Sequence, residues 1–453
     1  MLSSTKQRGL RTLLSMMEVM QPAFTRPGFR NAWVIFSGWV LTMGVHAVTQ
    51  ALVATDVARR LHHERFHRFF SRGSWKPDEV GKLIFHCIVE KLCPEGRIRL
   101  VLDDTLSSSK GAEIFGIGSH LDAVRSTKRF RVFCFGHVWV TLSVVVRVPF
   151  SSRPWALPVL FRLYRNKGEC QSRGDTYAKK TELGRQMVDT AVQWANGRLI
   201  DLAVDSAYCN DTLIRGLSET VTVIGAIRPD AVLTAAPTLA EQKKSGRRRK
   251  RGALLPKPQE LYADTRVPWK RIRLELYGES KLIHYKTIEA QWYRGAGARL
   301  GRIVIVRIDD GAIRMRVFFC TDPERDVPDV LLTYSGRWST EVCYRDLKQH
   351  MGFADSSARK KEAVERTAPF VGYIYSLLVL WFADSIWTTS LATPPIRPWY
   401  RHRKHASFAD IVRAAQRLLL TVDVLDPARG LNNLGQLADD LKFTRYSAPK
   451  EAA

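Results

Sequence analysis

The sequence is poor in the features that mark secreted, disulfide-rich and zinc-binding proteins. Its 453 residues include only seven cysteines, an odd number scattered along the chain. No two of them have the Cys-x-x-Cys spacing of a structural zinc site, and no secretory signal is evident at the N-terminus. The sequence therefore indicates neither a disulfide framework nor a zinc site, and we expect reduced thiols in a cytosol.

Acidic residues are few relative to basic ones. Asp and Glu number 44, whereas Lys and Arg number 70, which gives a formal net charge of +26. This excess argues against a metabolic enzyme with a small substrate and indicates a polyanionic partner, most simply nucleic acid. A basic protein of the membrane surface is the alternative, but the sequence has no lipidation motif.

Long hydrophobic runs are also few. Residues 32–54 are apolar enough to be considered as a membrane span, but His46, Gln50 and two glycines interrupt them. Residues 368–387 form a second apolar run, which contains Gly, Tyr, Ser and Asp. We predict buried helices in both places, the second one under a sheet, and no membrane association.

The remaining patterns predict a mixed α/β protein with a helical N-terminal domain in residues 1–98. In residues 99–227 strands come first and then alternate with helices, which is typical of a mixed sheet. Residues 228–330 look like an insertion whose extended stretches predict an antiparallel β-rich subdomain. Residues 331–390 complete the core, and residues 391–453 form a basic helical C-terminal region. The predicted strands are residues 98–105, 130–135, 138–148, 199–205, 221–227, 271–276, 283–292, 301–308 and 312–320, and the predicted core helices are 179–195 and 210–217.

Two stretches are rich in cationic residues and are candidates for DNA binding. Aromatic and cationic side chains interleave in residues 62–72, which favours a DNA-recognition domain slightly over an ordinary basic helical surface. A second run of cations lies in the insertion and could be a solvated loop or a clamp on a phosphate backbone. The cations of this run are Lys243, Arg247, Arg248, Arg249, Lys250 and Arg251.

Two apolar strands end on acidic residues. The first ends on Asp103 and Asp104, and the second ends on Asp205. A strand-terminal Asp often only starts a turn, but two such strands side by side would bring two carboxylates together. Carboxylates that close need a cation between them, and oxygen ligands select Mg²⁺ or Mn²⁺. Because Asp103 and Asp104 point to opposite faces of the strand, only one should be a ligand; we choose Asp103, with Asp104 as the alternative.

A predicted helix at residues 334–348 supplies a third carboxylate. Ser335 and Gly336 suit its start, and Gly352 lies just past its end. Its Tyr, Arg, Glu and Lys at positions 334, 337, 341 and 348 fall within an arc of roughly 60° on a helical wheel. The alternative is a solvated helix face held by ion pairs one turn apart. With the two aspartates, Glu341 could complete a pair of metal sites that activate one oxygen and steady another in a phosphoryl displacement.

These residues resemble the DDE transposases of the RNase H-like superfamily. The spacing Tyr334-x2-Arg337-x3-Glu341-x6-Lys348 matches the YREK signature of a large group of bacterial insertion-sequence transposases, and Asp103-x-Thr105 is similar to their first catalytic strand. The resemblance covers about residues 99–390. It implies an RNase H-like mixed sheet flanked by helices, with the β-rich insertion between the fifth strand and the Glu helix.

The resemblance also implies a function and a set of roles. Asp103, Asp205 and Glu341 would hold two Mg²⁺ or Mn²⁺ ions, and water and then a 3′-OH would attack phosphodiesters at the element ends and in target DNA. Arg337 and Lys348 would contact DNA phosphates, and Tyr334 would position the terminal nucleotides. The implied partners are double-stranded DNA and a second subunit in a homodimer, in the bacterial cytoplasm on the nucleoid.

The sequence leaves open which Trp, if any, would stack on a flipped base, and which of several functions the protein has. In relatives that form a DNA hairpin, a Trp of the insertion stacks on a flipped base. Trp269 and Trp292 are candidates, although a Trp packed inside the β-rich segment is the simpler interpretation of either. A non-catalytic DNA-binding regulator derived from such an element, or a simple metal-dependent nuclease, is the alternative function.

Overall fold

The computed structural model describes residues 4–109, 111, 113–122, 125–127, 129–238, 249–276, 278–307, 315–393 and 405–427. Contacts within it group the chain into two units, Trp75–Ser376 and Met1–Ser74 with Leu377–Ala453. This grouping places helix α5 (Pro77–Leu92) with the sheet, because it packs on strands β3 and β4. The predicted domain boundaries at residues 98, 227, 330 and 390 stay predictions.

The unit that contains the N-terminus is helical in its described residues. The apolar run at residues 32–54 forms two helices, α2 and α3, that pack on each other, as predicted. A Cβ on Gly38 would lie 2.3 Å from the carbonyl oxygen of Ala51, so glycine permits their close approach. Ser407 is the N-cap residue of α15. The helices of this unit are α1 (Ser4–Glu18), α2 (Arg26–Leu41), α3 (Val48–Ala54), α4 (Glu64–Ser71) and α15 (Phe408–Leu419).

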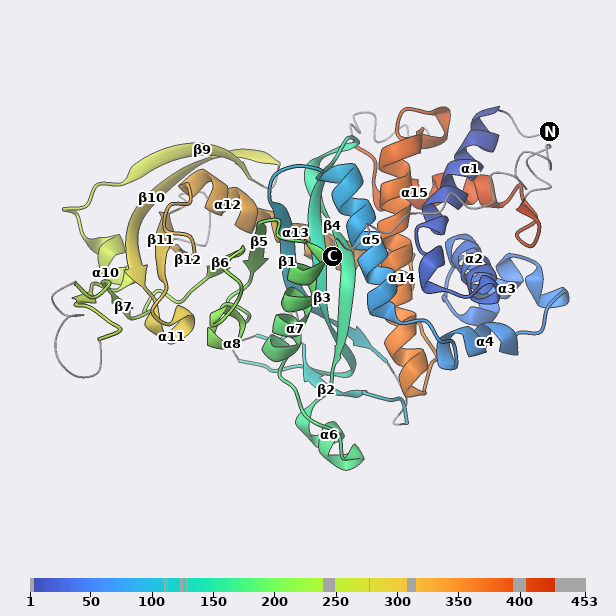
Figure 1. Ribbon diagram of the computed structural model, residues 1–453, viewed down its shortest axis with the longest axis horizontal. Helices are drawn as coiled ribbons and strands as arrows, with labels where there is room; N and C mark the ends of the chain where they lie inside the picture. The colour runs from blue at the N-terminus through green and yellow to red at the C-terminus, as the bar shows by residue number, and fades with distance from the viewer. Residues whose placement is uncertain are drawn as a thin grey trace, which may run out of the picture. The chain divides into compact units, whose positions relative to one another are not determined.

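The second unit contains a mixed sheet of twelve strands in the described part of the chain (Figure 1). The order is β2-β3-β1-β5-β6-β12-β11-β10-β7-β8, with β4 paired to β3 and β9 paired to β10. Strands β1, β5 and β6 are parallel to one another, and the other pairs are antiparallel. The strands are β1 (Ile98–Ser108), β2 (Gly118–Leu121), β3 (Phe133–Val148), β4 (Ser151–Tyr164), β5 (Ile200–Val204), β6 (Val221–Ala226), β7 (Leu233–Thr234), β8 (Leu254–Leu255), β9 (Lys270–Leu276), β10 (Glu279–Gln291), β11 (Leu300–Arg307) and β12 (Arg316–Cys320).

The predicted mixed α/β class is confirmed, with two corrections in the first strands. The strands predicted at 130–135 and 138–148 are one strand, β3, because Gly136 continues the pairing with β1 where a Cβ would lie 2.1 Å from the Ser107 carbonyl oxygen. Strand β4 was not predicted because Pro154 and Pro158 interrupt its pattern. It lies at an edge and shifts register near Pro158, which is where a strand tolerates proline.

The β-rich insertion contains the expected strands but continues the core sheet. Strand β12 pairs antiparallel with β6 through Phe318 and Ala226, so β12, β11 and β10 extend the sheet beyond its parallel strands. A second apolar cluster lies where helix α12 covers this extension, around Val304, Phe318 and Val330.

Helices cover both faces of the sheet. Asp103 and Thr141 face each other across β1 and β3, and Thr141 is hydrogen-bonded to Tyr344 of α13, so α13 lies on their face. Lys180, the first residue of α7, bonds Asp104, whose side chain points the other way. The remaining described α-helices of this unit are α6 (Lys167–Arg173), α7 (Lys180–Trp194), α8 (Asp211–Ile214), α10 (Pro258–Ala263), α11 (Tyr293–Ala296), α12 (Val327–Gly336) and α13 (Trp338–His350).

The apolar run at residues 368–387 lies in α14 (Lys361–Trp381) and a following π-helical turn. The stretch is long and apolar enough to cross a membrane, but 83% of its apolar window is buried inside the protein. Tyr373 and Tyr375 pack against Phe161 and Trp155 of β4. The predicted burial of this helix against the sheet is therefore confirmed.

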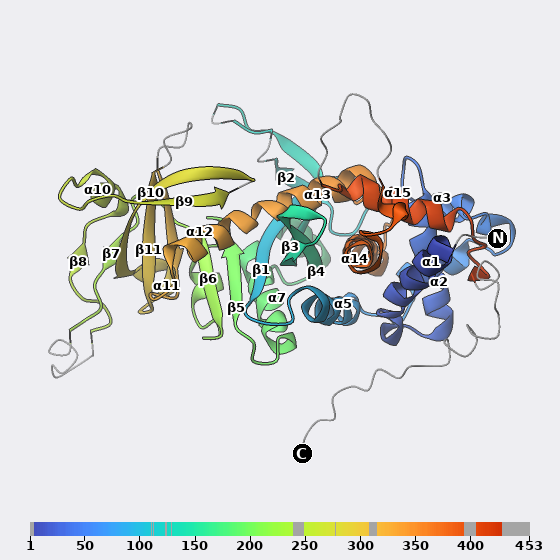
Figure 2. The ribbon, with the colours of Figure 1, turned by 90° about the horizontal axis from the view of Figure 1, so that it is seen from above.

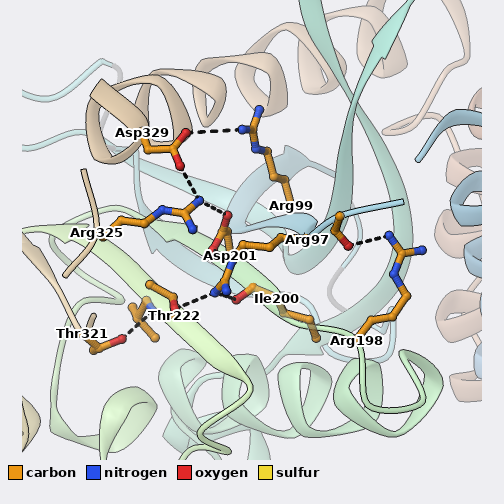
Figure 3. A network of polar contacts seen from close by, with 11 residues as sticks. Arg97, Arg99, Arg198, Ile200, Asp201, Thr222, Thr321, Arg325 and Asp329 are labelled. Atoms are coloured by element: carbon orange, nitrogen blue, oxygen red, sulfur yellow. Dashed lines mark hydrogen bonds and ion pairs between the residues drawn. The ribbon is translucent and has the colours of Figure 1, made fainter. Parts of the chain in front are cut away.

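A network of buried charges joins α12 to the amino ends of the parallel strands (Figure 3). Asp201 of β5 is fully buried, and it accepts hydrogen bonds from Arg97 at 2.6 Å and from Arg325 at 2.7 Å. Arg97 also donates to Thr222 of β6, and Arg325 pairs with Asp329 of α12 at 2.9 Å. The first turn of α12 is thereby attached to the sheet.

We predict that Asp201→Asn destabilises the protein by about 3 kcal/mol, because two largely buried guanidinium groups lose their shared anion. The free energy of unfolding, measured by urea denaturation, checks this. The matched control is Asp230→Asn, which removes the exposed partner of Arg228 and should leave the unfolding transition unchanged. Equal transitions for parent and Asp201→Asn would contradict the stabilising role of the network.

Candidate active site

Asp103 and Asp205 lie side by side at the level where strand β5 ends. Asp103 is in the middle of β1, which continues to Ser108 beyond its predicted end at residue 105, and Asp205 directly follows β5. Leu102 of β1 is paired with Val204 of the parallel strand β5, so the next residue on each strand is an aspartate at the same level. Parallel neighbours are about 4.8 Å apart and point to the same face. The structure thus brings together the two aspartates that the sequence analysis selected.

Asp103 is a buried carboxylate held by two donors. Its Oδ1 accepts from the backbone N–H of Asp104 at 2.8 Å, and its Oδ2 accepts from Arg337 Nη1 at 2.9 Å. Its side chain is 14% exposed. Burial raises the pKa of Asp103 to about 7, Arg337 lowers it, and the charge of Asp205 raises it. A cation on this face therefore favours ionised Asp103.

Asp104 has different partners on the opposite face of β1. Its Oδ1 accepts from the hydroxyl of Tyr208 at 2.8 Å, and its Oδ2 accepts from Lys180 Nζ at 2.7 Å. Both of its oxygens are therefore engaged with α7 and the turn after β5. Of the two aspartates that competed for the first ligand position, Asp103 is the one that shares a face with Asp205 and Arg337.

Arg337 connects Asp103 to Glu341. Its Nη1 bonds Asp103, and its Nη2 donates to Glu341 Oε1 at 2.9 Å. Because one planar guanidinium spans both contacts, the two carboxylate oxygens lie no more than about 8 Å apart. The third predicted carboxylate thus reaches the same site from α13.

The residues predicted as one helix at 334–348 belong to two consecutive helices, α12 and α13, and Glu341 lies in the first turn of α13. Helix α12 starts at Val327, with Pro328 in its first turn, and Gly336 is its last residue instead of part of a helix start. Arg337 keeps helical dihedral angles (φ −55°, ψ −35°), so α13 continues in nearly the same path. The common face of Arg337 and Glu341 that the helical wheel predicted is therefore preserved across the junction.

The other two residues of the signature lie on either side of this pair. Tyr334 is half-buried, with its ring 4.6 Å from that of Phe318 and 5.9 Å from the Arg337 guanidinium. Burial raises the pKa of Tyr334. Lys348 Nζ donates to the carbonyl oxygen of Leu106 at 2.8 Å, three residues after Asp103 on β1. The four signature residues therefore line one path along the carboxyl edge of the sheet.

The acidic residues fit an oxygen-ligated cation in part. Asp103 and Asp205 present the adjacent carboxylates that Mg²⁺ requires. Within the described residues, no group of three or more His, Cys, Asp or Glu is gathered closely enough to hold a metal ion. The guanidinium of Arg337 stands between Asp103 and Glu341, where it offsets their charges. A metal shared by all three carboxylates therefore requires Arg337 to turn away.

Sequence reasoning passed over Trp338, which is 52% exposed beside Arg337 at the start of α13. The two Trp residues it named are packed instead: Trp269 lies 5.2 Å from the Tyr262 ring, and Trp292 lies 5.5 Å from the Phe319 ring. The sequence could have pointed to Trp338, because this residue directly follows Arg337 of the Tyr-Arg-Glu-Lys signature.

The basic run of the insertion is described only in part. Lys243, Arg247 and Arg248 lie outside the described residues. Arg249, Lys250 and Arg251 are exposed, and the Arg251 guanidinium lies 4.5 Å from the centre of the Tyr293 ring. The clamp on a phosphate backbone stays a prediction.

The fold and the site together define a mixed α/β protein with an acidic site beside a cationic helix at the carboxyl edge of its sheet. The chain belongs to the DDE superfamily endonucleases, whose family model matches residues 19–298. A search of curated proteins found no match. Among solved structures, the chain is similar to the piggyBac transposase synaptic complex with hairpin DNA, with a TM-score of 0.44 and 10% identity over 99% of this chain and 84% of that chain.

We predict that ionisation of Asp103 makes stability depend on pH in metal-free buffer. The folded pKa of about 7 exceeds the ordinary 3.8, so the stabilising contribution of the neutral carboxyl is complete below pH 4 and is lost as the pH rises through 7. Asp103→Asn removes this loss. Relative to the parent, the variant should gain ~2–4 kcal/mol in unfolding free energy between pH 4.5 and pH 8 in EDTA. A difference that does not change with pH would contradict the raised pKa.

Proposed function

We propose that the protein is a DNA transposase that cleaves and joins strands at the terminal inverted repeats of an insertion sequence. The observation that carries the proposal is the Asp103–Asp205 pair with Glu341 joined to it through Arg337, in a member of the DDE superfamily endonucleases. The RNase H-like assignment and the YREK group are part of this proposal. The formal charge of +26 supports DNA as the substrate.

The three carboxylates would hold two Mg²⁺ or Mn²⁺ ions, and enzymes of this family generally use divalent metals. When bound, the ions supply an activated oxygen nucleophile and stabilise the leaving oxygen. The side chains of the protein would bind and position the DNA. Arg337 would exchange its carboxylate partners for a DNA phosphate, which a planar guanidinium binds in the same forked geometry. Asp103 and Glu341 would then become available together.

The flanking residues would orient the nucleotides at the cut. Lys348 would bind a phosphate beside the end of β1, and Tyr334 would position the terminal nucleotides next to Arg337. Trp338 is exposed next to Arg337, whereas Trp269 and Trp292 pack against other rings, so Trp338 is better placed than either to stack on a base. We propose a homodimer on the DNA, acting in the bacterial cytoplasm on the nucleoid.

Two alternatives remain distinct from transposition. A non-catalytic regulator would have no need for a buried aspartate beside a second one, because an uncompensated pair of carboxylates destabilises the fold. A simple nuclease of the same fold would use the same site. Strand transfer separates the nuclease from the transposase, because only a transposase joins the freed 3′-OH to a second DNA.

The proposal predicts that Glu341→Gln abolishes cleavage. Purified protein is incubated with Mg²⁺ and labelled duplexes carrying the DNA that flanks the gene. The parent should cut them and, with a target plasmid present, join the ends to it. The variant should be at least about 10³-fold slower, because one metal ligand is lost. Comparable cutting by parent and variant would exclude Glu341 as a catalytic residue.

We further predict that Lys348→Ala weakens binding of end DNA at moderate salt. Loss of one phosphate contact should lower the slope of log K against log salt by about 0.9 and the affinity by roughly 3- to 10-fold. Fluorescence anisotropy of a labelled duplex measures both. Lys348→Arg keeps the charge and should retain most of the affinity. Normal binding and cutting by Lys348→Ala would remove this residue from the DNA contacts.

A further inference from the structure

We infer that the β2–β3 hairpin is a second DNA-gripping element, with Phe130 inserted in the minor groove and Arg129 and Arg131 on the flanking phosphates. This inference rests on the proposed function, because the hairpin extends from the catalytic edge. None of its residues belongs to the acidic site or the signature helix. Strand β2 and the beginning of β3 form a two-stranded ribbon that projects from the sheet (Figure 2).

The described residues at the end of the hairpin are fixed by hydrogen bonds. The Asp122 N–H donates to the Val132 carbonyl oxygen at 2.9 Å. The Thr127 N–H donates to the Phe130 carbonyl oxygen at 2.8 Å, and the Phe130 N–H donates to Thr127 Oγ1 at 3.0 Å. Phe130 is thus held to Thr127 by two hydrogen bonds, and fewer conformations of its backbone lower the entropic cost of binding through it.

The exposed surface of the hairpin combines apolar and cationic groups. Phe130 is 69% exposed, and one face of the ribbon carries further exposed apolar side chains. That face carries Leu121, Phe133 and Phe135, which are 49%, 62% and 45% exposed and which the pairing of Leu121 with Phe133 places in one row. Such a row is costly in water unless a partner covers it.

Charge decides which partner fits this row. Arg125, Arg129 and Arg131 are exposed around it. The acidic residue beside them, Asp122, is 15% exposed and pairs with Arg125 at 3.6 Å. A partner must therefore be anionic at its rim and apolar within. Duplex DNA has this chemistry, and a two-stranded ribbon with Arg side chains and an apolar wedge suits its minor groove.

The hairpin adjoins the proposed cleavage site. Strand β1 carries Asp103 and then pairs with the base of the hairpin through Ser107 and Ser108, opposite His137 and Gly136. Lys348 binds β1 at Leu106, just before this point. The eleven residue-to-residue steps from Thr141, which faces Asp103, to Phe130 span at most about 36 Å of extended chain. Phe130 should therefore contact DNA within about ten base pairs of the cut phosphodiester.

The test measures DNA binding in a Glu341→Gln background, so that cleavage does not interfere. The probe is a fluorescein-labelled 40-base-pair duplex from the DNA flanking the gene, in Ca²⁺ and over a range of salt concentrations. The double variant Arg129→Ala/Arg131→Ala should bind roughly 10-fold more weakly, with a salt slope lower by about 1.8. Phe130→Ala should bind roughly 5- to 50-fold more weakly with an unchanged slope, because its contact is apolar.

Control variants show whether binding depends on the charge and the aromatic ring of these side chains. Arg129→Lys/Arg131→Lys and Phe130→Trp should retain binding, and Leu254→Ala, which removes another exposed apolar side chain, should bind like the parent. The substituted side chains are exposed, and equal unfolding midpoints verify that the variants fold. Placing 2-aminopurine at successive positions should show Phe130-dependent fluorescence at a step within ten base pairs of the cut.

The outcomes distinguish this inference from the proposed function. Normal DNA binding by the hairpin variants, together with a parent protein that cuts DNA, overturns the hairpin contact and leaves the transposase intact. Loss of binding in the hairpin variants, with a parent that cuts nothing, supports the hairpin contact and overturns the transposase. If the hairpin variants bind DNA normally but no longer form dimers in sedimentation, the row contacts a second copy of the chain, and the inference is overturned. If they bind DNA normally but no longer bind anionic vesicles, the row contacts a membrane, and the inference is likewise overturned.

Discussion

Two aspartates at the same level of neighbouring parallel strands, one of them largely buried, are held side by side, and this constraint organises the site. Parallel pairing of β1 with β5 fixes the spacing of Asp103 and Asp205. Their mutual repulsion and the burial of Asp103 call for a positive charge on that face. Arg337 supplies it, and the same guanidinium brings in Glu341.

The supporting structure places that guanidinium with little freedom. Helix α12 has ten residues and spans about 15 Å, close to the length of the five-residue strand β5 that it covers. Asp201, Arg325 and Asp329 attach the first turn of α12 to the amino ends of the strands. The other end of the helix therefore lies near the carboxyl ends of the strands, where Arg337 follows it. One end of the sheet therefore anchors the helix, and the other end carries the chemistry.

Local patterns were enough to predict the features that depend on neighbouring residues in the chain. Apolar runs identified β1, β5 and β6, and helical spacing put Arg337 and Glu341 on one face. The sequence could not show that β12 joins β6, because pairing across 90 residues depends on tertiary contacts. It also missed β4, whose prolines are tolerated only at an edge, and the hairpin row, because alternating Phe and Arg looks alike whether it is buried or exposed. The sequence favoured Asp103 over Asp104 as the ligand, but it could not show that Lys180 and Tyr208 bind Asp104 on the other face, because those contacts are tertiary.

The most direct test of the account is the anomalous scattering of Mn²⁺ in a crystal of the protein with cleaved end DNA. The account predicts manganese peaks with oxygens of Asp103, Asp205 and Glu341 at about 2.1–2.2 Å, and Arg337 turned from the carboxylates to a DNA phosphate. Manganese on Asp104, or Arg337 still bridging Asp103 and Glu341 while DNA occupies the site, would contradict it.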